Sequence, residues 1–308
     1  MEPPGPITYP QAATHAPIFA MGGLVASLRP QQWVKNGFVF AALIFSRSIT
    51  DWHRNARVAA GAFLFCLISS AVYLFNDILD APEDRRHPLK RLRPLASGRL
   101  GVGTASIAAV ILAILSLYGA WLLDRTFFVV LLAYALINVL YSWALKRVVL
   151  LDVFVISAGF VLRVISGGVI IHVEISPWLV VCATLLALFL ALSKRRHELV
   201  VLGKDASNHR SILAHYSPYF LDQLIGIVTA STVMSYALYT LSSDAQVKFP
   251  GKRLEFTIPF VLFGIFRYLY LVHQGEEGGN PTRLLFTDLV LLSVVLFWAA
   301  SVIFIIYL

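Results

Sequence analysis

The chain has 308 residues, of which 58% are hydrophobic and only 14% are charged, and its mean hydropathy is +0.76. Soluble globular domains are nearer half apolar and a quarter charged, so this composition excludes an ordinary soluble protein. The net charge of +8 would suggest nucleic acid as the partner of a soluble protein. In a chain this apolar it indicates basic loops that face an anionic membrane leaflet, and we expect no nucleic-acid partner.

Apolar runs of about 18 residues or more recur along the chain, which is typical of transmembrane helices. The first 27 residues are rich in Pro and Ala and predict a disordered tail, without a cleavable signal peptide, ahead of one membrane domain over 28–308. The fold class predicted for that domain is an all-α bundle of nine transmembrane helices. The expected spans are 36–50, 57–79, 103–123, 126–145, 149–172, 177–196, 218–242, 254–273 and 284–307.

The distribution of Lys and Arg predicts the orientation of these spans. With the N-terminus inside, 17 Lys and Arg side chains fall on the cytoplasmic side and seven on the opposite side. Basic loops favour the cytoplasm, so we expect a cytoplasmic N-terminus and an external C-terminus in the cell or inner membrane. The polar motifs described next would then cluster on the cytoplasmic side.

The stretch YLFNDILDAPEDRRHPLKRLRP, residues 73–94, concentrates charge at the end of an apolar helix. Asp77, Asp80 and Asp84 lie within about 60° of one another on a helical face, and Asn76 flanks them. Three carboxylates on one face repel one another unless a cation lies among them. Oxygen ligands on a wet helix end suit Mg²⁺, which takes waters and substrate phosphates as its other ligands. The alternative is a solvated helix end whose acids pair with the arginines that follow.

A basic run follows the acidic residues directly. Arginine binds phosphate oxygens through two parallel hydrogen bonds, and lysine adds a compact point charge. A metal beside such a loop predicts a site for a diphosphate. The residues expected to bind its oxygens are Arg85, Arg86, Lys90, Arg91 and Arg93.

The motif NDILDAPED resembles the NDxxDxxxD motif of the UbiA-type intramembrane prenyltransferase superfamily, whose members are nine-helix bundles. The resemblance covers almost the whole chain after residue 27. More narrowly, LRPQQWVKN, AVYLFNDILDAPEDRRHPLKRLRPLASG, YSWALKRVVLLDVFVISAGFVLRVISGG and KRRHEL resemble the branch that transfers phosphoribose to a polyprenyl phosphate. The resemblance places further residues at the active site, with Lys146 as a phosphate ligand: Lys35, Asn36, Tyr141, Lys146 and Asp152.

Ordinary members of the superfamily carry a second Asp-rich motif after the sixth helix. Here the corresponding stretch, SKRRHELVVLGKDASNHR, has Asp205 as its only aspartate, and basic residues such as Lys194 and Arg195 dominate it. One acidic cluster holds one metal-bound diphosphate, and a facing basic cluster favours a further anion. Glu198, four residues after Lys194, would orient that lysine, bind a ribose hydroxyl or balance charge. The alternative is a loop that serves only topology and lipid headgroups.

Arg163 lies eleven residues after Asp152, which is about 16 Å along a helix and brings both to the same face. An ionisable group at that depth rarely faces lipid. Gly167 and Gly168 permit close approach of a helix or a ligand. We expect Asp152 and Arg163 to line a polar cavity that opens to the cytoplasm, and the alternative is a buried ion pair with another helix.

Together these features predict a Mg²⁺-dependent transferase in which a polyprenyl phosphate attacks C1 of phosphoribosyl diphosphate and expels pyrophosphate. The expected catalytic residues are Asp77, Asp80, Lys146 and Lys194, and the expected metal ligands are Asp77, Asp80 and Asp84. The product would be a lipid-linked ribose phosphate, a precursor for arabinose-containing or other glycans. Membrane lipids would surround the protein, and a homo-oligomeric assembly is left open.

Two other functions are compatible with parts of the sequence. A UbiA-type prenyltransferase would move an isoprenyl group from its diphosphate to an aromatic or other acceptor, and a second acidic cluster near 194–210 would favour it. A transporter of anionic metabolites would need polar residues at both membrane faces. The acids and most of the bases are expected at one face, which disfavours transport.

Overall fold

The computed structural model describes residues 17–86, 90–202, 211–274 and 279–308. These residues form helices joined by short turns, and no strand occurs among them. Eight of the described helices are long and apolar enough to cross a membrane. The prediction of an all-α protein with many membrane spans is therefore confirmed.

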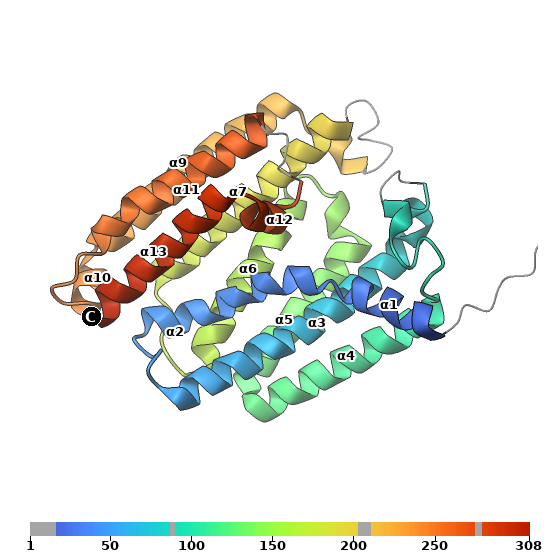
Figure 1. Cartoon of the computed structure of the whole chain (residues 1–308), viewed down its shortest axis with the longest axis horizontal. Coiled ribbons are helices and arrows are strands. Elements are labelled where there is room, and N and C mark those ends of the chain that lie inside the picture. The colour runs from blue at the N-terminus through green and yellow to red at the C-terminus, as the bar shows by residue number, and fades with distance from the viewer. Residues whose placement is uncertain (1–16, 87–89, 203–210, 275–278) are drawn as a thin grey trace, which may run out of the picture.

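Eight long helices make up most of the bundle (Figure 1): α3 (Trp52–Asp84), α4 (Val102–Leu123), α5 (Arg125–Trp143), α6 (Leu151–Ile170), α7 (Pro177–Leu202), α9 (Pro218–Leu241), α11 (Ile258–Gln274) and α13 (Leu289–Tyr307). Shorter elements connect them: α1 (Pro17–Leu28), η1 (Pro30–Phe40), α2 (Ala41–Phe45), η2 (Lys90–Leu92), η3 (Leu145–Arg147), η5 (Ser211–His215), α10 (Ser243–Lys248), η6 (Leu254–Thr257) and α12 (Pro281–Thr287). Proline is the first residue of α7, α9 and α12. Proline lacks an N–H group, but the first N–H of a helix has no intrahelical partner, so no hydrogen bond is lost.

The expected span 36–50 differs from the prediction. Its first third lies in η1, a 3₁₀ helix, and the five-residue α2 follows, so no continuous α-helix forms there. This segment packs closely against α6. A Cβ added at Gly167 of α6 would lie only 2.0 Å from the carbonyl oxygen of Val39. The small residue lets the two backbones touch. Eight rather than nine of the described helices thus qualify as spans.

Two other expectations about the elements differ from the structure. Residues 17–27, which were assigned to a disordered tail, lie in α1 (Pro17–Leu28), and residues 1–16 lie outside the described residues. The expected span 284–307 is divided at Asp288 into α12 and α13. The Asp288 carboxylate accepts the N–H of Leu291 at 2.6 Å and caps α13, which explains the break.

Residues of α6 contribute to the two largest hydrophobic clusters of the core. Val153, near the start of α6, packs with residues of α7, α9 and α11. Ile170, at its end, packs with residues of α3 and α5. Figure 1 accordingly shows α6 between these two groups of helices. About 61% of the apolar stretch of α6 is buried. This helix therefore packs against both groups of helices, α7, α9 and α11 on one side and α3 and α5 on the other.

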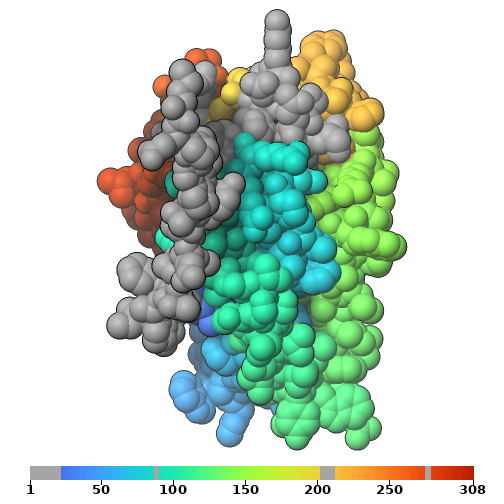
Figure 2. Space-filling view, turned by 90° about the vertical axis from the view of Figure 1, so that its right-hand side faces the viewer, coloured from blue at the N-terminus to red at the C-terminus, as the bar shows by residue number. Residues whose placement is uncertain are grey.

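The outer helices present apolar side chains to their surroundings. Only 11% of the apolar stretch of α4 is buried. Its exposed residues include Ile107, Ile114 and Leu122. Figure 2 shows α4 and α5, in green, along one long side of the molecule. Such a surface is compatible with lipid rather than water.

The long helix α3 carries the acidic motif at its end. Its 33 residues correspond to about 50 Å, whereas the hydrocarbon core of a membrane is about 30 Å thick. A helix that crosses the core from Trp52 therefore extends beyond it before Asp77. The acidic end of α3 thus lies outside the hydrocarbon core.

Candidate active site

The acidic end of α3 is held by arginines from two other segments. Asp77 and Asp84 are buried, with 2% and 4% of their surface exposed. Nη1 of Arg93 lies 3.2 Å from Oδ1 of Asp77 and 2.7 Å from Oδ2 of Asp84. Arg29, at the start of η1, donates to the same oxygen of Asp77. One guanidinium nitrogen of Arg93 thus bonds to both carboxylates and partly neutralises their negative charge.

Asp80 faces a different partner. Nζ of Lys146 lies 2.5 Å from Oδ1 of Asp80, and Nδ2 of Asn76 donates to Oδ2 at 2.9 Å. Lys146 belongs to η3, 66 residues further along the chain. The structure thus brings together Asn76, Asp80 and Lys146, which were each predicted as site residues.

The carboxylates provide the right chemistry for a divalent cation, although three of them do not converge here. Among the described residues, no group of three His, Cys, Asp or Glu side chains is placed to hold one metal ion. The Asp77 and Asp84 carboxylates already share one positive centre in Arg93. Hard oxygen donors in this arrangement fit Mg²⁺ bound by two carboxylates, with water and substrate oxygens as further ligands.

The basic run after the acids is mostly exposed. Arg93 turns inward to the acids, and Lys90 is half-buried. Arg85, Arg86 and Arg91 are exposed. Residues 87–89 lie outside the described residues. The alternative prediction was that the arginines after the helix pair with its acids. Among the described arginines of this run, Arg93 alone does so.

Beside the acidic end, η1 brings Lys35 and Asn36 to α6. The buried Asn36 accepts a hydrogen bond from Nε of Arg163 at 2.8 Å. The Arg163 guanidinium also donates to the hydroxyl of Tyr134 and to the carbonyl of Gly159, at 2.8 and 2.9 Å. It is only 4% exposed. Arg163 therefore forms a buried polar layer with neutral partners, and it makes no described ion pair with Asp152.

Lys35 lies in a strongly positive environment. The pKa of Lys35 is lowered from 10.5 to about 7, first by burial and then by the nearby charges of Lys194, Arg163 and Arg29, in that order of size. Among the described residues, no carboxylate forms an ion pair with Lys35. The positive charge around Lys35 favours the binding of an anion there.

The basic stretch of α7 is divided between the site and the core. Lys194 is 41% exposed, and its Nζ lies 3.9 Å from Oε1 of Glu198. Arg195 is 1% exposed and contacts the other oxygen of Glu198. Its Nε lies 2.9 Å from Oδ2 of the fully buried Asp152. Arg195 and Asp152 thus form a buried ion pair between α7 and α6.

Three contacts of the site were not predicted from the sequence: Arg29 with Asp77, Tyr134 with Arg163, and Tyr216 with Asp152. Arg29 belongs to the LRPQQWVKN stretch, which was the one signal available for it. Tyr134 and Tyr216 occur in apolar surroundings without a motif. Tyr141, which was predicted, is half-buried near the end of α5.

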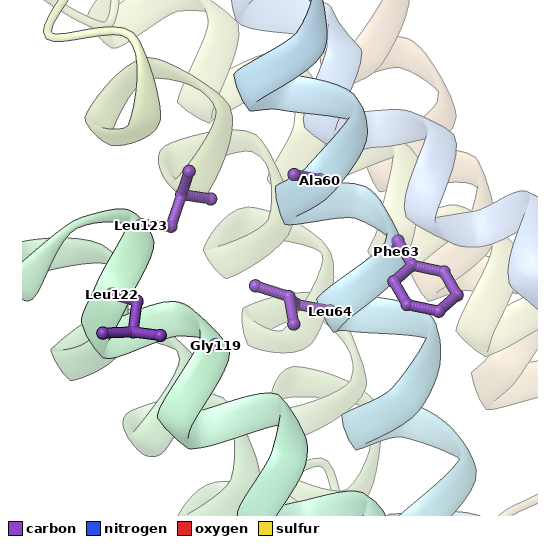
Figure 3. Close-up of a pocket in the computed structure, with 6 residues that line it drawn as sticks. All are labelled: Ala60, Phe63, Leu64, Gly119, Leu122 and Leu123. Atoms are coloured by element: carbon purple, nitrogen blue, oxygen red, sulfur yellow. The ribbon is translucent and has the colours of Figure 1, made fainter.

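A shallow hollow of about 340 Å³ lies between α3 and α4 (Figure 3). Its walls are apolar, and Phe63 and Leu122 on its rim are 58% and 67% exposed. Leu64, which points into it, is 13 residues before Asp77 on α3, or about 20 Å along the helix. The hollow therefore belongs to the lipid-facing surface and not to the polar site.

A family model now identifies the class of protein that this fold and site define. The model of the UbiA prenyltransferase family matches residues 37–198, from η1 to the basic stretch of α7. The chain belongs to this family and is a membrane-embedded transferase.

Several relatives that match most of the chain share one name. Decaprenyl-phosphate phosphoribosyltransferase of Corynebacterium glutamicum is 33% identical over 92% of this chain and 87% of its own. The protein of that name from Mycobacterium tuberculosis is 32% identical over 94% and 96% of the two chains. A solved UbiA homolog from Archaeoglobus fulgidus bound to GPP and Mg²⁺ covers 91% of this chain and 99% of its own, with a TM-score of 0.68 at 20% identity. This last likeness concerns the fold.

Proposed function

We propose that the protein transfers 5-phosphoribose from phosphoribosyl diphosphate to a polyprenyl phosphate and releases pyrophosphate. The names of the relatives from C. glutamicum and M. tuberculosis support this substrate pair. The observation that carries the proposal is the positive charge around Lys35. Lys194, Arg163 and Arg29 lower the pKa of Lys35 after burial, and no carboxylate among the described residues forms an ion pair with this lysine.

This distribution of charge suits one diphosphate and one separate phosphate. The carboxylates of Asp77 and Asp84 would hold a single metal-bound diphosphate. A prenyl diphosphate with an aromatic acceptor offers no second phosphate for the cations around Lys35. Two phosphate-bearing substrates do. Asp205, the one aspartate of the stretch after α7, lies outside the described residues.

In this proposal, Mg²⁺ bound by Asp77 and Asp84, with Asp80 beside them, would neutralise charge on the leaving diphosphate. Lys146 and Arg93 already lie at these acids, within reach of the same diphosphate. The exposed loop arginines would bind its outer oxygens. These residues would orient the donor so that its C1 faces the acceptor and the leaving diphosphate points away from it.

The cations of η1 and α7 would position the acceptor. Lys35 and Lys194 hold the lipid phosphate, and Glu198 orients Lys194 through their ion pair. A phosphate oxygen forms the new bond to C1 while the bond to pyrophosphate breaks and its electron pair leaves with pyrophosphate. No general base is needed, because the phosphate is anionic near neutral pH. The rate then depends on neutralising the leaving group and on positioning.

The orientation in the membrane is part of the same proposal. Phosphoribosyl diphosphate is a soluble, highly charged donor, so the polar end of the bundle would face the cytoplasm. The excess of Lys and Arg in the loops at that end supports this orientation, with the C-terminus on the outer side of the inner membrane.

A labelled donor tests the proposal. Purified protein in lipid nanodiscs would receive phosphoribosyl diphosphate labelled in the ribose, together with Mg²⁺ and decaprenyl phosphate. The expected result is label in the organic extract that depends on the lipid phosphate. A parallel reaction with geranyl diphosphate and 4-hydroxybenzoate should yield no product. Prenylation of the aromatic acid, without label in the lipid, would instead identify an ordinary UbiA-type prenyltransferase.

A further inference from the structure

The turn that carries Lys146 ends in a strained residue. Leu150, four residues after Lys146, has φ 66° and ψ −37°. A leucine rarely adopts a positive φ, because its Cβ approaches the backbone too closely. Such a residue persists only where its surroundings hold it. The structure of the turn between α5 and α6 therefore requires a specific restraint.

The hydroxyl of Tyr216 supplies that restraint. It accepts the N–H of Leu150 at 2.8 Å and donates to Oδ1 of Asp152 at 2.9 Å. Tyr216 is 5% exposed, and its ring stacks on Phe220 with the planes inclined by 18°. The other oxygen of Asp152 faces Arg195. One buried hydroxyl thus connects the backbone of the turn to the ion pair between α6 and α7.

We infer that Tyr216 is a positioning residue of the active site, which holds the turn at Leu150 and thereby directs Lys146 toward Asp80. The segment before Tyr216, η5, contacts η3, the element on which Lys146 lies. Only three residues separate Lys146 from the restrained Leu150, so a shift of the turn moves the lysine. The inference rests on the proposed function for the role of Lys146 in phosphate binding.

Tyr216→Phe tests the inference, because it removes only the hydroxyl and keeps the buried ring. We expect kcat/KM to fall about tenfold, which is the usual effect of losing one buried hydrogen bond such as that to Leu150. Tyr219→Phe is the matched control. Tyr219 is three residues away and 71% exposed, and its hydroxyl contacts only Gln223 among the described residues. Its kinetics should equal those of the wild type.

A double mutant separates positioning from general destabilisation. If Tyr216 acts through Lys146, the loss caused by Tyr216→Phe should vanish once Lys146→Met has removed the amine. The double mutant should then match Lys146→Met within about twofold. A further tenfold loss in the Lys146→Met background would overturn the inference.

Hydrogen exchange provides a readout that does not depend on the reaction. The amide of Leu150 should exchange faster in Tyr216→Phe than in the wild type and in Tyr219→Phe, while exchange in α3 stays the same. Unchanged exchange at residues 145–152 would also overturn the inference. A wild type that transfers no phosphoribose would refute the proposed function instead, and the exchange result would still decide whether the hydroxyl holds the turn.

Discussion

At the scale of single residues, Asp77 has the most direct link to the proposed chemistry. Its carboxylate lies against Arg29 and Arg93 and would be a metal ligand. Asp77→Asn keeps the size of the side chain and removes its charge. We expect kcat with Mg²⁺ to fall at least about 100-fold, or roughly 2.7 kcal/mol in activation free energy. Turnover at saturating Mg²⁺ and the melting temperature would both be measured.

Glu83→Gln is the control for this substitution. Glu83 also lies at the end of α3 but is exposed, so its neutralisation should leave kcat within about twofold of the wild type. Chelation should silence the wild type, and added Mg²⁺ should restore it. Mg²⁺-dependent turnover retained in full by Asp77→Asn would rule out its role as a metal ligand.

The pKa of Lys35 predicts a pH dependence of substrate binding. Because that pKa is lowered to about 7, the amine is charged at pH 6 and mostly neutral at pH 8. The affinity for the lipid phosphate should therefore fall as the pH rises through 7. Lys35→Arg keeps its charge over this range, so its KM should lack that component. Wild-type and Lys35→Arg profiles that run parallel from pH 6 to 8 would contradict the assignment.

At the scale of elements, the basic run in α7 shows that neighbouring charged residues can have different roles. Lys194 and Arg195 are adjacent and were both expected to bind phosphate. Successive side chains on a helix point about 100° apart, so one faces the site and the other faces α6. The burial of Arg195 follows from its partner Asp152, 43 residues away. That pairing has no local signal in the sequence.

The two residues should consequently respond differently to truncation. Lys194→Ala should raise the KM for a phosphate substrate about 10- to 100-fold with little change in melting temperature, because a charge-assisted contact is lost. Arg195→Ala should cost about 3–5 kcal/mol of stability, because it removes the buried cation that pairs with Asp152. The KM for the phosphate substrate and the thermal unfolding of each variant would distinguish them. A stable Arg195→Ala with weakened binding would restore the original expectation that Arg195 binds phosphate.

The opposite end of the bundle has its own connection between elements. Arg57, on α3, donates to the carbonyl of Ile170 at 3.0 Å and to that of Leu123 at 3.1 Å. It therefore caps the C-terminal ends of α6 and α4 together. Arg57→Met should lower stability by about 1–3 kcal/mol without changing KM. Arg54→Gln, at a side chain that is 42% exposed, should be nearly neutral in thermal unfolding.

Equal melting temperatures for Arg57→Met and Arg54→Gln would show that the cap contributes no stability. Changed KM values in Arg57→Met would show that the two ends of the bundle are coupled. We expect neither result. The KM in particular should not change, because Arg57 lies 20 residues before Asp77 on α3, about 30 Å along the helix.

Most helices could be predicted from the sequence because hydropathy and proline are local signals. The starts of α7 and α9 at Pro177 and Pro218 agree with prediction. The stretch 36–50 could not be predicted, since apolar composition does not distinguish a 3₁₀ helix from an α-helix. Its form is tied to contact with Gly167, far along the chain. The break at Asp288 depends on a capping bond that composition does not reveal.

At the scale of the whole molecule, the site consists of contacts between distant parts of the chain. Asn36 and Arg163 are 127 residues apart, and Asp80 and Lys146 are 66 apart. Local patterns identified which of these residues were polar and unusually placed. The fold decides which of them meet. The acids of α3, the lysine of η3 and the cations around Lys35 gather in this way at one end of the bundle.

The central claim is that this end of the bundle joins two phosphate-bearing substrates. The most direct test measures pyrophosphate released from phosphoribosyl diphosphate by proteoliposomes, with and without polyprenyl phosphate. We predict release only when the lipid is present, in equal amounts with ribose phosphate recovered in the lipid fraction. Release that is independent of the lipid, or no release while a prenyl diphosphate is consumed with an aromatic acceptor, would contradict the account.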